Sequence, residues 1–166
     1  MPLGMCLLSV ATLLGFGSFL CVSVQNLRTS GVTDLNDQLT LQSTVVPIFA
    51  MSLALFWWTI STTRRHPLTL AFTSDVPVHL QTTGPYAYVR HPFYLAYVLF
   101  WIGAAVAANE LVSWIMPVVM TLSYVAAARR EESKFEASPL ASDYKVYRLQ
   151  TGMLVPHLRF RYGKVL

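Results

Sequence analysis

The stretch from Arg90 to Glu132, "RHPFYLAYVLFWIGAAVAANELVSWIMPVVMTLSYVAAARREE", consists of two apolar runs with charged residues at both outer ends. The runs cover residues 93–108 and 111–128, and only the polar pair Asn109-Glu110 lies between them. A connection this short makes two helices antiparallel neighbours. The pattern therefore predicts a tight helical hairpin whose charged flanks meet at one end.

Composition places this hairpin in a membrane. The chain has 166 residues, of which 54% are hydrophobic and 12% charged, and its mean hydropathy is +0.49, far from the average of soluble domains. Two more apolar runs, residues 3–24 and 44–62, also approach the roughly 17 to 25 residues that a helical span requires. The first has no basic flank before it and is too long for a secretory signal, so it reads as a retained helix. We expect an all-α integral membrane protein with about four transmembrane helices, the last two forming the hairpin.

Orientation follows from the basic residues between the runs. The connection 25–41 contains only Arg28, whereas the connection 63–91 contains Arg64, Arg65 and Arg90, and the other eight basic residues follow Ala128. The positive-inside rule therefore predicts that the 63–91 connection, the tail and the N-terminus are cytosolic. The net charge of +4 does not indicate nucleic-acid binding, because the basic residues flank apolar runs and no nucleic-acid motif accompanies them.

No internal boundary divides the chain, and we expect a single domain over residues 1–166. Its parts are two N-terminal spans (1–62), a cytosolic connection (63–91), the hairpin (92–128) and a cytosolic tail (129–166). Within the hairpin, Gly103 with Ala107 and Ala104 with Ala108 have the spacing of small residues that lets membrane helices approach closely. Such a spacing predicts a close helix contact on this face.

The triplet Arg-His-Pro occurs twice, and position separates the two copies. The first, residues 65–67, follows a span whose last turns carry Trp57 and Trp58. This pattern is typical of a span that ends at the membrane interface, with aromatic residues at the boundary and basic residues just outside it. The second, residues 90–92, precedes a span. Pro92 stands where a helix begins, and its missing N–H costs nothing at that position.

A cationic pair before a helix is unfavourable by itself, because the N-terminal end of a helix already carries partial positive charge. Arg90 and His91 are understandable there if an anion sits between them and the free N–H groups. The local pattern thus predicts a site for a carboxylate or a phosphate. A plain inside-positive flank is the alternative interpretation of Arg90.

The hairpin brings a second charged group to the same end, because Arg129, Arg130, Glu131 and Glu132 directly follow its second run. Taken alone, "RREESKFE" is typical of a solvated helix end with i,i+3 and i,i+4 charge pairs. Opposite Arg90, however, the four charged residues become candidates for a functional site.

Three segments together resemble a known family. They are "HLQTTGPYAYVRHPFY", "RREESKF" and "DYKVYRLQTGMLVP", which span residues 79–156, about half of the chain. In this order they are similar to the isoprenylcysteine carboxyl methyltransferase family, and more broadly to the membrane methyltransferases that include phospholipid N-methyltransferases. The ordered set is much more specific than the Arg-His-Pro triplet, which this chain contains twice.

The resemblance implies an endoplasmic reticulum enzyme of prenylated protein processing. It would bind S-adenosyl-L-methionine on the cytosolic side, take a lipid substrate laterally from the bilayer, and use its C-terminal tail to help close the cofactor site. Carried over by position, the cofactor-binding residues are His79, Gly84, Tyr86, His91, Pro92, Tyr94, Glu132, Tyr144 and Tyr147. The catalytic residues nearest the methyl acceptor are Arg90, Arg129, Arg130 and Glu131.

The implied chemistry requires neither a metal nor a covalent intermediate, because methyl transfer from a sulfonium is an in-line displacement that depends on positioning. Tyrosine faces attract a sulfonium by roughly 0.5 to 2 kcal/mol each. A prenylcysteine carboxylate needs only steering, whereas a phospholipid amine must first lose a proton to a base. The arginines favour the carboxylate, with a lipid amine as the alternative acceptor and a non-catalytic membrane scaffold as the alternative class.

Overall fold

The computed structural model describes residues 35–64, 77 and 79–157. Within them the helices are α2 (Leu35–Thr63), the 3-10 helix η1 (Gly84–Ala87), α3 (Pro92–Ala108), the 3-10 helix η2 (Leu111–Trp114), α4 (Ile115–Glu136) and α5 (Ala141–Gln150). This described part contains no strand, only an isolated parallel bridge between Val89 and Gly152. The all-α prediction is confirmed for it, and the predicted run 3–24 lies outside the described residues.

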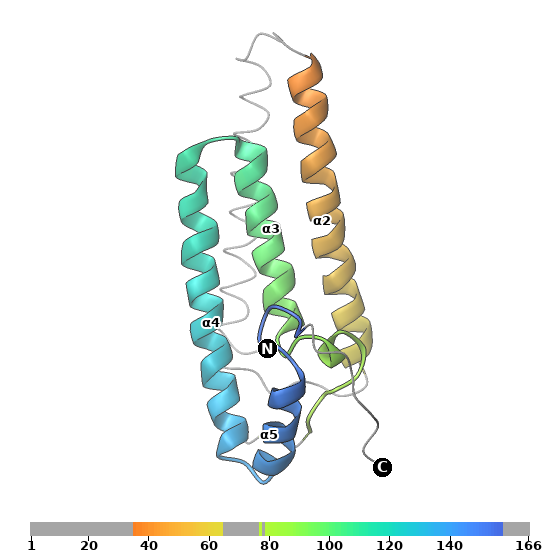
Figure 1. The fold of residues 1–166 in the computed structure, drawn as a ribbon, viewed down its shortest axis with the longest axis vertical. Coiled ribbons are helices and arrows are strands. Elements are labelled where there is room, and N and C mark those ends of the chain that lie inside the picture. Colours follow the sequence, from red (N-terminus) through yellow and green to blue (C-terminus); the bar gives the residue numbers. More distant parts are fainter. Residues whose placement is uncertain (1–34, 65–76, 78, 158–166) are drawn as a thin grey trace.

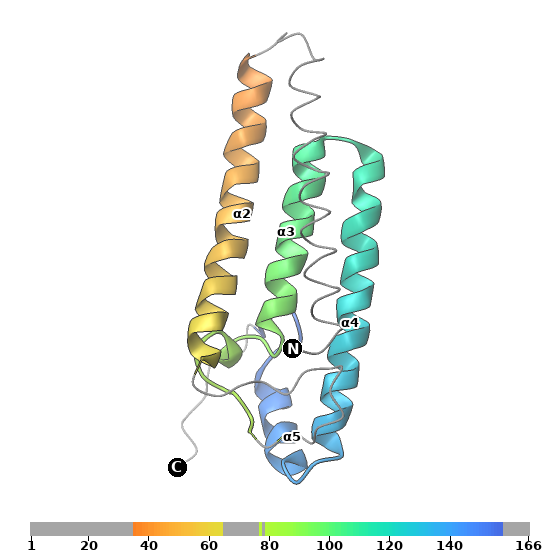
Figure 2. The same ribbon diagram turned by 180° about the vertical axis from the view of Figure 1, so that it is seen from behind.

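The three long helices lie side by side, with α3 between α2 and α4 (Figures 1 and 2). Helices α2 and α3 meet closely, since the Ser52 hydroxyl donates a buried hydrogen bond of 2.8 Å to the carbonyl oxygen of Ala96. A Cβ atom on Gly103 would lie 3.2 Å from Ile48 and 3.3 Å from Phe49. The small residue at position 103 therefore serves the contact of α3 with α2, because it leaves room for larger side chains of the neighbouring helix.

The hairpin turn is as short as expected. Asn109 ends α3 in the left-handed conformation (φ 52°), which asparagine adopts more readily than most residues, and its N–H donates to the carbonyl of Val106. Pro117 lies in the first turn of α4, where its missing N–H removes no intrahelical hydrogen bond. Helix α4 therefore accommodates this proline without a break.

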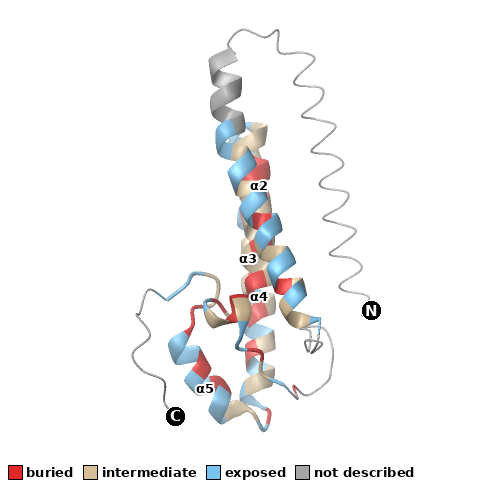
Figure 3. Cartoon of the chain, turned by 90° about the vertical axis from the view of Figure 1, so that its right-hand side faces the viewer, coloured by how far each residue is buried: buried red, intermediate tan, exposed pale blue. Residues whose placement is uncertain are grey.

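The outer faces of the long helices are apolar. The segments Ser43–Thr63 and Leu111–Glu136, of 21 and 26 residues, are long and apolar enough to cross a membrane, and Pro92–Ala108 is a shorter apolar helix. Figure 3 shows exposed positions along the helices, and many of them carry large hydrophobic side chains. Among these are Val46, Leu53, Trp57, Ile115, Val118 and Leu122. An apolar surface of this extent suits lipid rather than water.

Helix α4 continues past its apolar part and leads to α5. It ends at Glu136, before the proline at position 139, and the Ser138 hydroxyl accepts a hydrogen bond from the N–H of Leu140 in the turn that follows. Helix α5 then lies beside the charged end of α4 and below α3 (Figure 1). The tail thus returns to the open end of the hairpin.

Candidate functional site

The Arg90-His91-Pro92 triplet forms the start of α3. Pro92 is the first helical residue and is fully buried, and His91 precedes it as the N-cap. The carbonyl oxygen of His91 accepts the hydrogen bond from the N–H of Leu95. Because proline fits the first position of a helix, the sequence places the two cationic side chains at a defined point on the end of the bundle.

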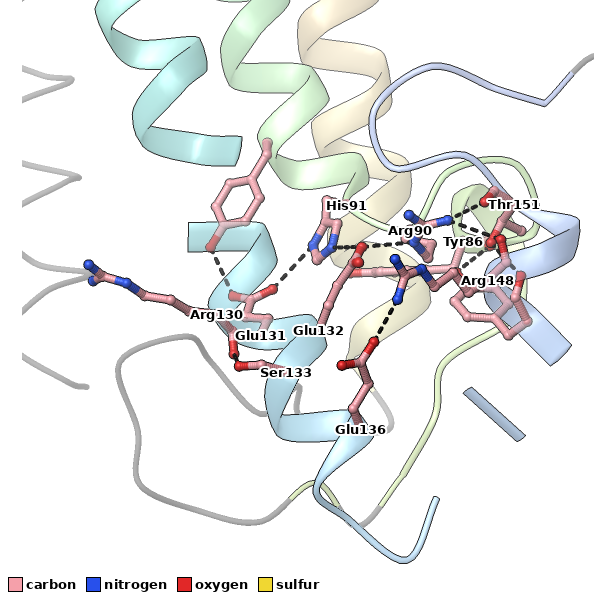
Figure 4. A network of polar contacts seen from close by, with 12 residues as sticks. Tyr86, Arg90, His91, Arg130, Glu131, Glu132, Ser133, Glu136, Arg148 and Thr151 are labelled. Carbon is pink, nitrogen blue, oxygen red and sulfur yellow. Dashed lines mark hydrogen bonds and ion pairs between the residues drawn. The ribbon is translucent and has the colours of Figure 1, made fainter. Parts of the chain in front are cut away.

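The acidic pair of α4 meets these cations, as the hairpin predicts. Arg90 Nε lies 2.8 Å from Glu132 Oε1, His91 Nε2 lies 3.2 Å from the same oxygen, and His91 Nδ1 lies 3.2 Å from Glu131 Oε2 (Figure 4). The side chains of Arg90, His91 and Glu132 are each less than a tenth exposed, and that of Glu131 is 16% exposed. Two cations and two anions therefore form a compact buried cluster, which we call the charge cluster.

His91 is cationic in this arrangement. A carboxylate only accepts hydrogen bonds, so an imidazole that faces carboxylate oxygens through both nitrogens requires a proton on each. Burial lowers the pKa of His91, but the hydrogen bonds and negative charges of Glu131 and Glu132 outweigh it and raise the pKa above the ordinary value of 6.5. The cluster contains two positive and two negative charges as a result.

The anion expected beside Arg90 and His91 is thus part of the protein. The local sequence pattern predicts an external carboxylate or phosphate, but Glu131 and Glu132 occupy that position. The two cations do require compensation, and the hairpin supplies it from α4. An external carboxylate or phosphate is not required to compensate these cations, and it stays a prediction.

A ladder of rings extends from the charge cluster along the hairpin. The Tyr94 hydroxyl donates to Glu131 Oε1 at 2.8 Å, and its ring stacks on His91 at 5.6 Å and on Tyr124 at 5.4 Å between centroids. Tyr124 is 2% exposed and its hydroxyl accepts a hydrogen bond from Trp101 Nε1. Stacked and hydrogen-bonded rings fix the position of the Tyr94 hydroxyl and so of Glu131.

The C-terminal tail docks on the same end. The Tyr147 hydroxyl of α5 donates to the carbonyl of Tyr86 in η1 at 2.7 Å. After α5, the carbonyl of Gly152 accepts from the backbone N–H of Arg90 at 2.8 Å, and that of Met153 accepts from the N–H of His91 at 3.1 Å. These contacts connect segments about 60 residues apart in sequence, and they make the tail one wall of the site.

Tyr144 presents a hydroxyl that the described residues leave without a hydrogen-bond partner. Its side chain is 3% exposed, and its ring stacks on Phe135 with centroids 4.9 Å apart. Burial, and then the negative charge of Glu132, raise the pKa of Tyr144 above its ordinary value, so the hydroxyl keeps its proton. Glu132 is near this hydroxyl but does not form a hydrogen bond of ordinary geometry with it, and a buried donor that lacks a well-formed hydrogen bond is costly. A bound molecule beside Glu132 would satisfy the hydroxyl.

Four residues predicted for the site lie apart from the charge cluster. Arg129 and Arg130 are exposed, and neither side chain forms an ion pair or hydrogen bond within the described part of the chain. Figure 4 shows Arg130 directed away from His91. His79 is exposed and lies 3.3 Å from the Gln81 side-chain oxygen. Gly84 has φ +62°, and a Cβ there would lie 2.5 Å from the Thr62 hydroxyl, so a turn against α2 already explains the glycine.

The segment Thr151 to Met153 lies against Arg90 and His91, although no sequence pattern assigned it to the site. Thr151 is 3% exposed, and its carbonyl accepts a hydrogen bond from the Arg90 guanidinium. Gly152 has no room for a side chain, since a Cβ would lie 1.7 Å from the carbonyl oxygen of Val155. The dipeptide Thr-Gly was visible in "LQTGMLVP", but only the two tyrosines before it received roles.

The described residues contain no group of three His, Cys, Asp or Glu side chains that could hold a metal ion. The described part of the chain thus combines two helices long and apolar enough to cross a membrane with a buried charge cluster at one end. The family model for phospholipid methyltransferases matches residues 42–138, more than half of the chain, and the chain belongs to this family of membrane methyltransferases. No curated protein and no solved structure matches it.

Proposed function

We propose that this protein transfers a methyl group from S-adenosyl-L-methionine to an acceptor embedded in the membrane. Membership of the phospholipid methyltransferase family supports the reaction class, and the apolar outer faces of α2 and α4 support a membrane acceptor. The single observation that carries the proposal is the buried Tyr144 hydroxyl, which is close enough to Glu132 to interact with its carboxylate but forms no hydrogen bond of ordinary geometry within the described residues.

The residues around Tyr144 fit the cofactor. The Tyr144 hydroxyl can donate to a ribose or carboxylate oxygen of S-adenosyl-L-methionine, Glu132 can accept from its amino or hydroxyl groups, and the stacked rings of Phe135 and Tyr144 offer an apolar face. The proposed cofactor set remains the one carried over from the family resemblance. It comprises His79, Gly84, Tyr86, His91, Pro92, Tyr94, Glu132, Tyr144 and Tyr147.

When bound, the cofactor supplies an electrophilic methyl group on a sulfonium. Tyr144 and Glu132 would hold the cofactor, which would give up this methyl group to a lone pair of the acceptor and become S-adenosyl-L-homocysteine. The protein contributes position and exclusion of water, which are large effects when the reacting atoms lie in line. A rigid charge cluster is suited to this role, because Arg90, His91 and Tyr94 each hold a carboxylate of α4 in place.

Our first candidate acceptor is the C-terminal carboxylate of a prenylated cysteine. Each carboxylate of the cluster already accepts strong hydrogen bonds, Glu131 from Tyr94 and His91, and Glu132 from Arg90 and His91. Carboxylate oxygens that already accept these hydrogen bonds have fewer lone pairs free to take a proton from a substrate. An acceptor that is ionised near neutral pH requires no base, so this geometry supports a carboxylate, and the exposed Arg129 and Arg130 can attract it.

The second candidate is a phospholipid amine, and the family description favours it. In that case Glu131, the more exposed of the two carboxylates, is our candidate for the base. An endoplasmic reticulum location, cytosolic termini and a role in prenylated protein processing belong to the first candidate and are part of the same proposal.

The test is methyl transfer from labelled S-adenosyl-L-methionine by detergent-solubilised protein, with a farnesyl-cysteine analogue and phosphatidylethanolamine offered in parallel. Base-labile label on the farnesyl-cysteine is the expected result and identifies a carboxyl methyl ester. Base-stable label on the lipid amine would instead select the phospholipid. No binding of S-adenosyl-L-methionine by folded protein would contradict the proposal and leave a non-catalytic scaffold.

A further inference from the structure

The guanidinium of Arg90 contacts two parts of the protein at once. Its Nε donates to Glu132 of α4, and its Nη1 donates to the carbonyl oxygens of Arg148 and Thr151 at the end of α5. Figure 4 shows Arg90 between Glu132 on one side and Thr151 on the other. The carbonyls that end a helix lack intrahelical donors and carry partial negative charge, so a buried cation stabilises this end of α5.

The backbone beside Arg90 reinforces the same connection. Its N–H donates to the carbonyl of Gly152, and the next N–H, of His91, donates to that of Met153. Close packing of the tail on itself at Gly152 excludes a side chain there. The segment 148–153 therefore fits onto residues 89–91 in one register, set by Gly152 and by Arg90.

We propose that Arg90 is a positioning residue that couples the docking of the tail to the placement of Glu132, rather than a residue that contacts the methyl acceptor. The proposal revises the role carried over from the family resemblance, and its kinetic part rests on the proposed function. Two of the guanidinium nitrogens bond to the protein itself, to Glu132 and to the end of α5. Undocking of the tail releases Tyr144 and Tyr147 from the site, and loss of the guanidinium removes a partner of Glu132.

A lysine cannot replace this arginine in the proposed role. The planar guanidinium donates in two directions from fixed positions, whereas an ammonium is a compact charge on a flexible stem. Arg90→Lys keeps the positive charge beside Glu132. A change in tail protection or in cofactor KM in this variant therefore reports the loss of the two-sided contact. Gly152→Ala perturbs the tail from the other side, because the new Cβ would overlap the carbonyl of Val155, and it leaves Arg90 intact.

The experiment combines limited trypsin digestion of the solubilised protein with steady-state kinetics for both substrates, and uses Arg64→Lys at the exposed end of α2 as the matched control. In Arg90→Lys and Gly152→Ala, we expect cleavage after Lys145 and Arg148 to accelerate and the KM for S-adenosyl-L-methionine to rise by roughly tenfold, as for loss of one charged hydrogen bond. The KM for the acceptor should stay within about twofold, because the proposal gives Arg90 no contact with the acceptor and so predicts little change in the free energy of acceptor binding.

Unchanged tail protection in both variants would overturn the proposal, as would a raised KM for the acceptor with an unchanged KM for the cofactor. The digestion does not depend on turnover. An inactive wild-type protein with a protected tail that becomes sensitive in Arg90→Lys would therefore contradict the proposed function and still support the coupling.

Discussion

Two arginine–glutamate pairs connect α4 to the rest of the protein, and they differ in almost everything except distance. Arg90 and Glu132 are 2.8 Å apart, with side chains 9% and 7% exposed, whereas Arg148 and Glu136 are 2.6 Å apart and 51% and 55% exposed. The shorter pair is the weaker one, because water screens exposed charges and solvates them well when the pair opens. Burial, not distance, decides which pair matters.

The two glutamates are one helical turn apart on α4, so their difference follows from the neighbours that the fold provides. Glu132 lies on the inner face of α4 with Ala128 and Tyr124, next to the cations before α3. Glu136 lies beyond the bundle, and its ion-pair partner within the described residues is the exposed Arg148 of α5. This contrast gives each prediction about the charge cluster a control on the same helix.

The largest effect is expected for Glu132→Gln. It removes one of the two negative charges that compensate Arg90 and His91, and an uncompensated buried charge costs about 3 kcal/mol or more of stability. The same free energy corresponds to roughly 100-fold in a binding constant. We expect a lower melting temperature in detergent and loss of S-adenosyl-L-methionine binding. Measurement by differential scanning fluorimetry and equilibrium binding checks both, and wild-type values for the two would contradict the role of the cluster.

The next effect is a dependence of stability on pH, which we expect to arise from the protonation of His91. Its folded pKa is raised above 6.5 because the bonds and charges of Glu131 and Glu132 outweigh burial, so it stabilises the fold fully below pH 6.5 and less as the pH rises through the folded value. Arg90, Tyr94 and both glutamates face this group. Melting curves from pH 6 to about 9 should show a decline that His91→Gln abolishes. A decline of equal size in that variant would assign the dependence to another group.

A smaller effect, with opposite signs in two measurements, is expected for Tyr144→Phe. Removal of a buried hydroxyl without a partner should leave stability unchanged or raise it by up to about 1 kcal/mol, while affinity for S-adenosyl-L-methionine falls roughly tenfold. Chemical denaturation and equilibrium binding separate the two. A loss of stability with unchanged affinity would show that the hydroxyl has a structural partner instead.

The smallest effect belongs to the exposed pair. Glu136→Gln and Arg148→Ala should each change the free energy of unfolding by less than about 0.5 kcal/mol, because exposed pairs contribute little and are screened by salt. Denaturation of the two variants at low and high ionic strength measures this. A cost comparable to that of Glu132→Gln would remove the distinction between the pairs.

The sequence predicts the hairpin and also the meeting of the charged residues at its two outer ends. Because Asn109 and Glu110 alone separate the two apolar runs, Arg90 and His91 had to meet the acidic pair, and they do. The exposure of Arg129 and Arg130, which the family resemblance placed near the acceptor, comes from the structure: residues 124, 128 and 132 form the buried face of α4, and these arginines do not share it.

Other features depend on contacts that no local pattern specifies. The docking of Gly152 on Arg90 joins two loops through backbone hydrogen bonds, which do not depend on side-chain identity, so only the glycine gave a signal. Likewise the small residue Gly103 indicated a close contact but not its partner, which is α2. The other predicted span, residues 3–24, lies outside the described part of the chain and stays a prediction.

One measurement compares the two glutamates directly: equilibrium binding of labelled S-adenosyl-L-methionine to wild-type protein, Glu132→Gln and Glu136→Gln in the same detergent, with folding verified for each. If the charge cluster and the docked tail hold the cofactor, wild-type and Glu136→Gln bind it with similar affinity and Glu132→Gln does not. Equal affinity for all three, or no binding by folded wild-type protein, would contradict the assignment of this end of the bundle as a methyltransferase site.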